Sequence, residues 1–556
     1  MLKRCESIAH HENHVDRRSY EPVAAPRQRI EKETLMRRHR LIIGLLIIIG
    51  AARFAILLAS QTHVHSDEAI IGLMGKHILE GRYFPFYMYG QPYNAGAAWE
   101  AYLAAIAFAC FGISVVSLKS CIVVLSLLCL LLFYRMCLAL YDKRTALLAA
   151  IVFALIPSLL KWHFQVRGYS WYLLSIPLLT ILFASIESAS GPKRRTLFFF
   201  GLLCGLSIWC LELAIPLAVA LWLLLILRGR VSLNNAASSL LGVVVGYAPA
   251  IAFNLTHHFS NWRYLLIERP GGGFSSLFQL STYGRIFLHE MPKFFGPDTV
   301  LWYYPDTPAS GYVFYAIAAL AVIVAMWPFV QSPSKVIQAL GGNLPDCRQK
   351  NDFDMLVLTV ASLVPYLTMP AGVPSYFFGG CFFLSVLIAR MLERSFSCSK
   401  ALPRLGGVAA LTAILLTALV VMVMVVQKNQ IETLSSCDEG RSYCMTRIPA
   451  ADIEGVEHYL RQNNVTSVWT TISFIYPLLF ESGETLAVDN AIFEYPHWVY
   501  PQEIQWHEPS RDRDAVFVIE TNAAFRPLLE MRCAQAFGAP PLVSEYGKLT
   551  VIAEQR

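Results

Sequence analysis

Charged residues are scarce in this 556-residue sequence. They make up 15% of the chain, against roughly 25% in an average soluble domain, whereas hydrophobic residues make up 55%. This composition excludes an ordinary soluble enzyme and predicts a polytopic α-helical membrane protein. The net charge of +6 comes largely from residues 1–40. Because a nucleic-acid-binding domain presents its basic residues on a folded face, we expect no nucleic-acid partner.

Other common signals are also missing. Residues 1–40 contain no short apolar stretch followed by a small-residue cleavage site, so we expect no cleaved signal peptide there. We expect them to form a disordered basic tail that orients the first span. No spacing of the thirteen cysteines matches a zinc site. The sequence has no clear internal repeat and almost no ionisable residues in the middle of its apolar runs, which disfavours a transporter.

What is present is a series of apolar runs of about the length that crosses a bilayer. Eleven spans are predicted, at 41–60, 115–140, 145–161, 169–187, 196–212, 213–228, 235–253, 311–330, 354–370, 374–391 and 405–427. With this count every basic loop cluster falls on one side of the membrane, as the positive-inside rule requires. The N-terminus is therefore predicted to be cytoplasmic, at the plasma membrane if the source is bacterial.

Three parts of the chain are then expected outside. Residues 61–114 form a first external loop, because the apolar run at 97–111 is short for a span and typical of an interfacial or re-entrant helix. Residues 254–310 form a second external loop, and 41–427 as a whole form a transmembrane catalytic domain. Residues 428–556 are polar and predict a small extracytoplasmic α/β domain. Its expected elements are helices at 451–462 and 523–537, strands at 467–471 and 515–520, and a hairpin at 542–553.

An acidic pair, Asp67-Glu68, follows the first span and precedes a predicted helix at 69–81. Backbone N–H groups at a helix start stabilise a carboxylate and keep it ionised. The residues around the pair include Gln91, Tyr93 and Glu100, of types that contact sugars and their hydroxyls. An ionised carboxylate in such surroundings is suited to act as a general base. The alternative, more common for this local pattern, is that Asp67 is a helix N-cap and Glu68 a first-turn acid.

Two other kinds of site are considered. His63 and His65 offer metal ligands beside the acidic pair, but such clusters are common without metal, and a divalent ion is possible but not favoured. Arg167 lies between the third and fourth spans, and a guanidinium binds phosphate bidentately. An interfacial anchor belt explains the aromatic and basic residues around Arg167 equally well.

The block that starts at Asp67 resembles the GT-C glycosyltransferases of the protein-mannosyltransferase and aminoarabinose-transferase type, most closely the bacterial membrane branch called glycosyltransferase family 39. The resembling residues are Asp67-Glu68-Ala69-Ile70-Ile71-Gly72-Leu73-Met74, His77-Ile78-Leu79-Glu80-Gly81, Phe86-Tyr87-Met88-Tyr89-Gly90-Gln91-Pro92-Tyr93 and Glu100-Ala101-Tyr102-Leu103 through Phe111-Gly112. More loosely, the resemblance extends through the spans and into the C-terminal α/β part.

The resemblance implies an inverting membrane enzyme that takes its sugar from a polyprenyl-phosphate donor and needs no other cofactor. It assigns Asp67 as the general base and Glu68 as a supporting acid. Many relatives carry an Arg-Tyr pair where this chain has Ser375-Tyr376. The group that holds the donor phosphate is therefore expected among Arg167, His163 and Arg263, with Arg167 preferred.

The runner-up hypothesis is a transporter of a lipid-linked saccharide or polysaccharide. Either protein would have membrane lipid as a partner. The sequence does not identify the sugar or the acceptor, and a Cys437–Cys444 disulfide stays open.

Overall fold

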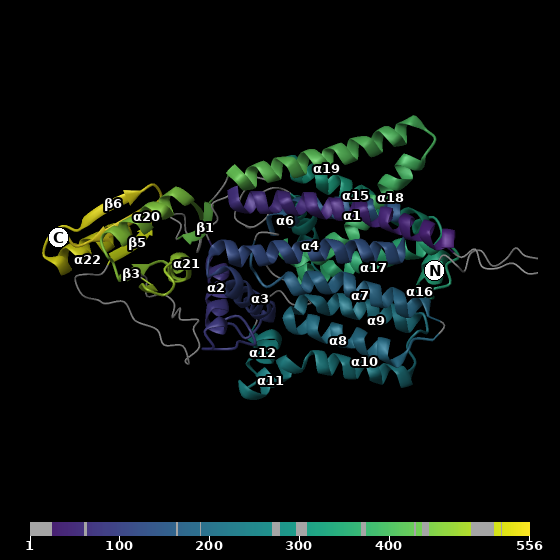
Figure 1. Ribbon diagram of the computed structural model, residues 1–556, viewed down its shortest axis with the longest axis horizontal. Helices are drawn as coiled ribbons and strands as arrows, with labels where there is room; N and C mark the ends of the chain where they lie inside the picture. The colour runs from purple at the N-terminus through teal and green to yellow at the C-terminus, as the bar shows by residue number, and fades with distance from the viewer. Residues whose placement is uncertain are drawn as a thin grey trace, which may run out of the picture.

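The computed structural model describes residues 25–59, 64–162, 165–189, 191–268, 278–295, 309–368, 374–427, 430–435, 444–490, 516–523 and 525–555. Long helices run roughly parallel to one another along the long axis of the molecule (Figure 1). A smaller part built of strands and helices lies beyond one end of this bundle, next to α2 (Figure 1).

Five helices of the described chain are long and apolar enough to cross a membrane. They are α1 (Ala25–Ala59), α4 (Val115–Leu140), α7 (Ser170–Ser188), α15 (Ala309–Val330) and α19 (Ala401–Gln427). A sixth candidate is the pair α10 (Leu233–Gly246) and α11 (Ala248–Thr256), bent by 52°. Pro249 lies in the first turn of α11, where a residue without an N–H group interrupts the helical hydrogen-bond ladder.

The remaining predicted spans coincide with helices that are shorter or more charged at one end. They are α5 (Lys143–Ala154) with α6 (Pro157–Trp162), α8 (Arg194–Cys210), α9 (Ile215–Leu227), α17 (Cys347–Thr368) and α18 (Phe378–Ser397). Each of the eleven expected segments is thus occupied by a helix or a helix pair. The prediction of a polytopic α-helical membrane fold is confirmed.

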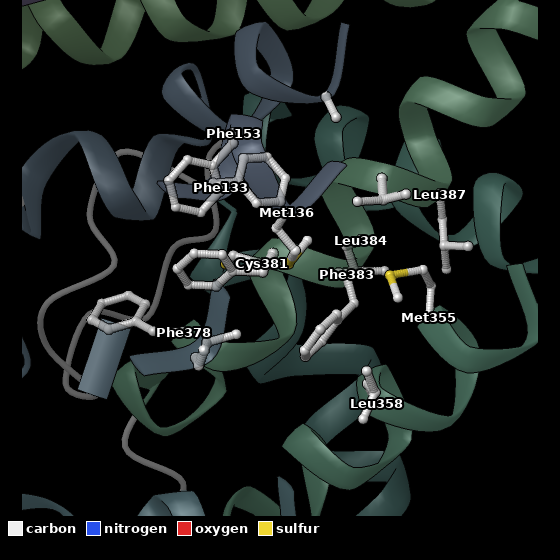
Figure 2. Packing of buried hydrophobic residues seen from close by; sticks show 14 of the residues in the cluster. Phe133, Met136, Phe153, Met355, Leu358, Phe378, Cys381, Phe383, Leu384 and Leu387 are labelled. Atoms are coloured by element: carbon white, nitrogen blue, oxygen red, sulfur yellow. The ribbon is translucent and has the colours of Figure 1, made fainter. Parts of the chain in front are cut away.

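The core of the bundle forms around α18, which is buried along most of its length. The rings of Phe133, Phe153 and Phe382 meet there, with centroids 4.6 to 5.5 Å apart. Figure 2 shows the surrounding packing, with Phe133 and Phe153 beside Cys381, and Met355 and Leu358 of α17 beyond Phe383. A helix that is apolar on all sides is expected at the centre of such a bundle.

Helices α8 and α10 pack backbone against backbone. A Cβ atom at Gly201 would lie 1.9 Å from the Ser239 carbonyl oxygen, and one at Gly242 would lie 2.2 Å from the Phe198 oxygen. Together with Gly205 and Gly246, these glycines form a small-xxx-small pair on each helix. This spacing lets membrane helices approach closely where the hydrophobic effect does not drive association.

Ion pairs join the ends of helices α7, α9, α17 and α18 at the bundle end opposite α2. Asp352 binds Arg390 at 3.0 Å and Arg394 at 2.6 Å, and Arg228 binds Glu187 at 2.7 Å and also Asp354. These are the segments whose basic residues predict a cytoplasmic location, so one end of the bundle collects them.

Shorter elements cover the other end. They are α2 (Ser66–Leu79), α3 (Ala95–Phe111), α12 (Ser260–Arg263), η3 (Tyr264–Glu268), α13 (Leu280–Gly284), η5 (Arg285–Glu290), α14 (Met291–Phe294) and η6 (Pro374–Phe377). The short helix η2 (Glu212–Ala214) joins α8 to α9. Helix α16 (Ser334–Leu340) lies at the opposite end of the bundle (Figure 1). The apolar run at 97–111 is confirmed as a helix. It packs mainly on α2 rather than passing through the bundle.

The C-terminal part is a small α/β domain with a five-stranded sheet in the order β4-β3-β5-β7-β6. The strands are β3 (Ser467–Thr470), β4 (Ala487–Asn490), β5 (Val516–Glu520), β6 (Leu542–Tyr546) and β7 (Leu549–Ala553), with helices α20 (Ala450–Gln462), α21 (Ile472–Glu481) and α22 (Arg526–Phe537). Strand β3 is parallel to β4 and β5, whereas β7 is antiparallel to its neighbours. The predicted helices, strands and hairpin are confirmed.

Three elements of this part are additional to the prediction. They are α21, β4 and a separate hairpin of β1 (Gln430–Ser435) and β2 (Cys444–Pro449). Cys437 lies outside the described residues, so the Cys437–Cys444 disulfide stays a prediction.

Glu484 docks the C-terminal domain onto helix α2. Its carboxylate accepts hydrogen bonds from Lys76 at 2.5 Å and contacts the buried His77 ring at 3.1 Å. Burial favours the protonated carboxyl, but the His77 and Lys76 contacts outweigh it and lower the pKa of Glu484 to about 2. The aromatic ring of Phe480 from α21 also fills the space over Gly72. The helix that carries the acidic pair is therefore held by the C-terminal domain.

We expect Glu484→Gln to lower the stability of the full-length protein by about 2 kcal/mol at neutral pH, allowing for partial solvent screening. Since the folded state binds fewer protons than the unfolded state, this contribution is present above about pH 4.5 and disappears as the pH falls through 2. Thermal unfolding of wild type and Glu484→Gln across this range measures it, with the exposed Glu454→Gln as control. A difference between the two proteins that persists unchanged at pH 2 would contradict the docking role.

Candidate functional site

The acidic pair lies in the first turn of helix α2, and the two carboxylates differ in their contacts. His65 is the N-cap: its ring nitrogen accepts a hydrogen bond from the Asp67 N–H at 3.3 Å. Glu68 closes a capping box by accepting the His65 N–H at 2.9 Å. The alternative prediction that Asp67 is the N-cap is therefore wrong. In the described part of the chain, no hydrogen bond or ion pair engages the Asp67 carboxylate.

Glu68 is almost fully buried and reaches three parts of the fold. Besides its capping bond, it accepts the Val166 N–H at 3.0 Å and pairs with Lys119 of α4 at 3.2 Å. These contacts fix the position of the carboxylate, and the role of Glu68 as a supporting acid stays a prediction. Lys119 is a residue that the sequence analysis missed. A lysine within an apolar span usually has a buried acidic partner, and that signal would have identified it.

Glu100 is also buried, and it holds the same loop as Glu68. It accepts the Gly168 N–H at 2.7 Å, the Ser170 N–H at 3.0 Å and the Ser170 hydroxyl at 2.6 Å. Burial raises the pKa of Glu100 to about 7, although these hydrogen bonds act in the opposite direction. Both oxygens of Glu100 accept hydrogen bonds from the protein, and the predicted substrate-binding role of Glu100 stays a prediction.

The loop also packs tightly against the start of α3. A Cβ atom at Gly96 would lie 1.9 Å from the Gly168 carbonyl oxygen. Gly168 itself has φ +82°, in the left-handed region that favours glycine. The backbone on both sides of Arg167 is thus fixed by two carboxylates and one close backbone contact. Fixed backbone is what a phosphate-binding arginine needs in order to present its guanidinium in one place.

Arg263 and His163 are the other two candidate phosphate ligands. Arg263 is exposed and forms an ion pair with Glu268 at 2.7 Å, so its charge is directed to another part of the second external loop. His163 lies outside the described residues and stays a prediction. Arg167 therefore stays the preferred prediction for the phosphate ligand.

Tyrosines from three segments gather beside Asp67. The rings of Tyr93 and Tyr264 stack 4.6 Å apart at an angle of 7°. Burial raises the pKa of the Tyr93 phenol well above its usual range, and the nearby Tyr264, Tyr376 and Asp67 raise it further. The first external loop, the second external loop and η6 therefore meet at one aromatic surface next to the uncommitted carboxylate.

The second external loop supports this surface. The Asn261 side chain donates to the Pro92 carbonyl oxygen at 2.6 Å, directly before Tyr93. Buried Asn254 in turn donates to Asn261 at 3.3 Å and accepts the Trp262 N–H at 3.1 Å. Gln91 lies in the same segment, half-buried. The roles of Asn261 and Tyr264 were not predicted, because nothing in their local sequence shows which distant loop they contact.

Metal ligands do not gather at the site among the described residues. In that part of the chain, no group of three His, Cys, Asp or Glu side chains is placed to hold an ion. His65 uses its ring nitrogen in the cap, and His63 lies outside the described residues.

The arrangement has three chemical elements at the bundle end nearest the C-terminal domain (Figure 1). Asp67 is a carboxylate available to accept a proton, the tyrosines form an aromatic wall, and Arg167 sits on a rigid loop. Glu68 and Glu100 connect these elements, since the first shares helix α2 with Asp67 and both hold the loop of Arg167.

No protein-family model matches the sequence, and no curated protein matches it. Among solved structures, the chain is similar to ArnT from Cupriavidus metallidurans bound to undecaprenyl phosphate, with a TM-score of 0.57 and 10% identity over 93% of this chain and 99% of that one. The apo form of the same protein gives a TM-score of 0.51 at 12% identity, over 92% and 99%. An oligosaccharyltransferase from Archaeoglobus fulgidus gives a TM-score of 0.48 at 12% identity, over 81% and 64%.

The similarity to ArnT extends over nearly the whole of both chains, including the spans, the external loops and the C-terminal domain. At this level of identity it establishes architecture. The chain is an integral membrane protein with the GT-C fold.

Proposed function

We propose that this protein transfers a sugar from a polyprenyl-phosphate donor to a hydroxyl acceptor at the membrane–water interface. The observation that carries the proposal is the pairing of an uncommitted carboxylate, Asp67, with a rigidly held arginine loop at the same end of the bundle. The fold adds support, because the structure of similar architecture from Cupriavidus metallidurans holds undecaprenyl phosphate. The N-terminus is placed in the cytoplasm and the Asp67 end on the outer face, following the distribution of basic loops.

The proposed reaction requires a base for the proton of the acceptor hydroxyl and a cation for the leaving phosphate. Asp67 accepts the proton of the acceptor hydroxyl, and the resulting oxygen nucleophile attacks the anomeric carbon of the sugar. The bond from that carbon to the phosphate oxygen breaks, and its electron pair leaves with the polyprenyl phosphate. Attack from the face opposite the phosphate inverts the anomeric configuration. Arg167 stabilises the leaving phosphate by charge-assisted hydrogen bonds.

Reconstituted wild-type protein supplied with a labelled polyprenyl-phosphate sugar tests this function. We expect release of the sugar onto an acceptor or water together with free polyprenyl phosphate. Movement of the intact donor across the membrane without cleavage would instead identify the transporter that the sequence leaves as an alternative.

We expect Arg167→Ala to weaken donor binding by about 10- to 100-fold, since a charge-assisted hydrogen bond contributes roughly 1.5–3 kcal/mol. Arg167→Lys should recover part of the loss, because an ammonium keeps the charge but not the bidentate geometry. Donor titration in nanodiscs measures both. Arg263→Ala is the comparison. If Arg263→Ala weakens donor binding and Arg167→Ala does not, the phosphate ligand is Arg263.

A further inference from the structure

The C-terminal domain contains a cavity that the transfer reaction does not use. Its volume is about 500 Å³, within the range of roughly 300–1,000 Å³ typical of small-molecule sites. It lies between the C-terminal ends of α20 and α21 and the segments that enter β3 and β4. The lining comprises Glu457, Leu460, Arg461, Asn464, Val465, Thr466, Leu478, Glu481, Ser482, Thr485 and Leu486.

The lining has two kinds of surface. Leucine and valine side chains supply apolar walls, of which Leu460 and Leu478 are buried. Around them lie planar groups and hydroxyl groups: two carboxyls, a guanidinium, an amide, two threonines and a serine. A ligand that fits has an apolar face and several hydrogen-bonding groups on its edge. A pyranose or furanose ring has this character, because its C–H groups form an apolar face and its hydroxyls project from the rim.

The charges of the cavity nearly cancel. The carboxyl groups of Glu457 and Glu481 both line the cavity, and two neighbouring carboxyls favour sharing one proton. Burial, together with Glu481, raises the pKa of Glu457 well above its usual range. Arg461 donates to Glu457 at 3.1 Å and offsets the one negative charge that the pair retains. One oxygen of Glu457 is buried and has no hydrogen-bond partner in the described part of the chain.

We propose that this cavity is a binding site for an uncharged saccharide, with the Glu457–Glu481 pair as its principal hydrogen-bonding group. An anionic ligand is disfavoured, because the C-terminal ends of two helices and the acidic pair face the cavity. A cationic ligand is disfavoured because a proton and Arg461 already neutralise the carboxyls. The paired carboxyls offer both a donor and acceptors, which is what sugar hydroxyls need.

The cavity also adjoins the contact that docks the domain. Ser482 and Thr485 line it, and between them the Gly483 carbonyl oxygen and the Glu484 carboxylate bind Lys76 of α2. A saccharide in the cavity is therefore held beside the helix that carries Asp67. The site is nevertheless built from the C-terminal domain alone, so direct binding tests it whether or not the protein transfers sugar.

The test uses full-length protein in nanodiscs and methyl glycosides of glucose, mannose, galactose and N-acetylglucosamine as probes, with glucosamine and glucuronate as charged counterparts. Saturation-transfer NMR and titration calorimetry measure binding. We expect at least one neutral glycoside to bind about tenfold more tightly than the charged counterparts. Tighter binding of glucosamine or glucuronate, or no glycoside binding at all, would overturn the proposal.

Variants locate the binding. Glu457→Gln should keep affinity within about threefold, because its amide replaces the protonated carboxyl, whereas Glu457→Met should lose at least about tenfold. Asn464→Gly removes the amide but keeps the backbone, since φ is +50° there, and should also weaken binding. Glu545→Gln, exposed on β6 and outside the cavity lining, is the matched control. Binding that survives both Glu457→Met and Asn464→Gly lies elsewhere and refutes the assignment.

Discussion

Asp67→Asn is expected to lower sugar transfer by at least about 100-fold while leaving the protein folded. A positioned general base contributes roughly 10²- to 10⁴-fold to a rate. The Asp67 carboxylate makes no hydrogen bond or ion pair within the described residues, so its replacement leaves no buried group without a partner. Only the favourable interaction with the helix start is lost, about 0.3–1 kcal/mol. Turnover should therefore fall while the stability of the protein changes little, which is the pattern expected of a catalytic residue.

The measurement is initial rate with a labelled polyprenyl-phosphate sugar, together with thermal unfolding of the same samples. Glu80→Gln is the matched control, because Glu80 lies at the opposite end of α2 and its carboxylate is partly exposed, in ion pairs with Lys76 and Arg82. Equal turnover by wild type and Asp67→Asn would remove Asp67 as the base. A parallel fall in stability and rate would assign it a structural role instead.

Gly96→Ala is expected to disable the protein by a different route. The added methyl would lie 1.9 Å from the Gly168 carbonyl oxygen, and this neighbour is backbone that cannot rotate away. Either α3 or the loop of Arg167 must shift, at a cost of about 2 kcal/mol or more. We expect donor affinity and turnover to fall together, because Arg167 moves with the loop.

Gly284→Ala is the control for this change, since a Cβ atom there meets no other atom within 4 Å. The comparison uses thermal unfolding and donor titration of the two variants. If Gly96→Ala behaves like Gly284→Ala, the close contact between α3 and the Arg167 loop does not control the site.

Much of this fold is predicted by the sequence. Long apolar runs and the one-sided basic loops predict the bundle, and the block from Asp67 to Gly112 predicts its outer elements. The C-terminal helices and strands follow from their periodicity. Helix α21 was missed because Ile472–Glu481 is almost uniformly apolar, and such a run does not show whether it packs as a helix or a strand.

The site was predicted less completely than the fold. Asp67 and Arg167 stand in places that suit their proposed roles, whereas Glu68 was expected as a supporting acid and Glu100 as a substrate-binding residue. Both are occupied by backbone N–H groups of Val166, Gly168 and Ser170. Backbone donors carry no sequence signature, so a carboxylate that holds a loop looks the same in sequence as one that meets a ligand.

The contacts around α2 also order events during synthesis. Helix α2 leaves the ribosome early, but the partners of its residues come much later: Val166 follows Glu68 by 98 positions, and Glu484 follows His77 by 407. Chains are made from the N-terminus at about 5–20 residues per second. The helix that carries Asp67 therefore lacks part of its support until the C-terminal domain has folded and docked on it. A chain that ends after α19 would keep the long apolar helices but lack the contacts of Glu484 with Lys76 and His77 that hold α2.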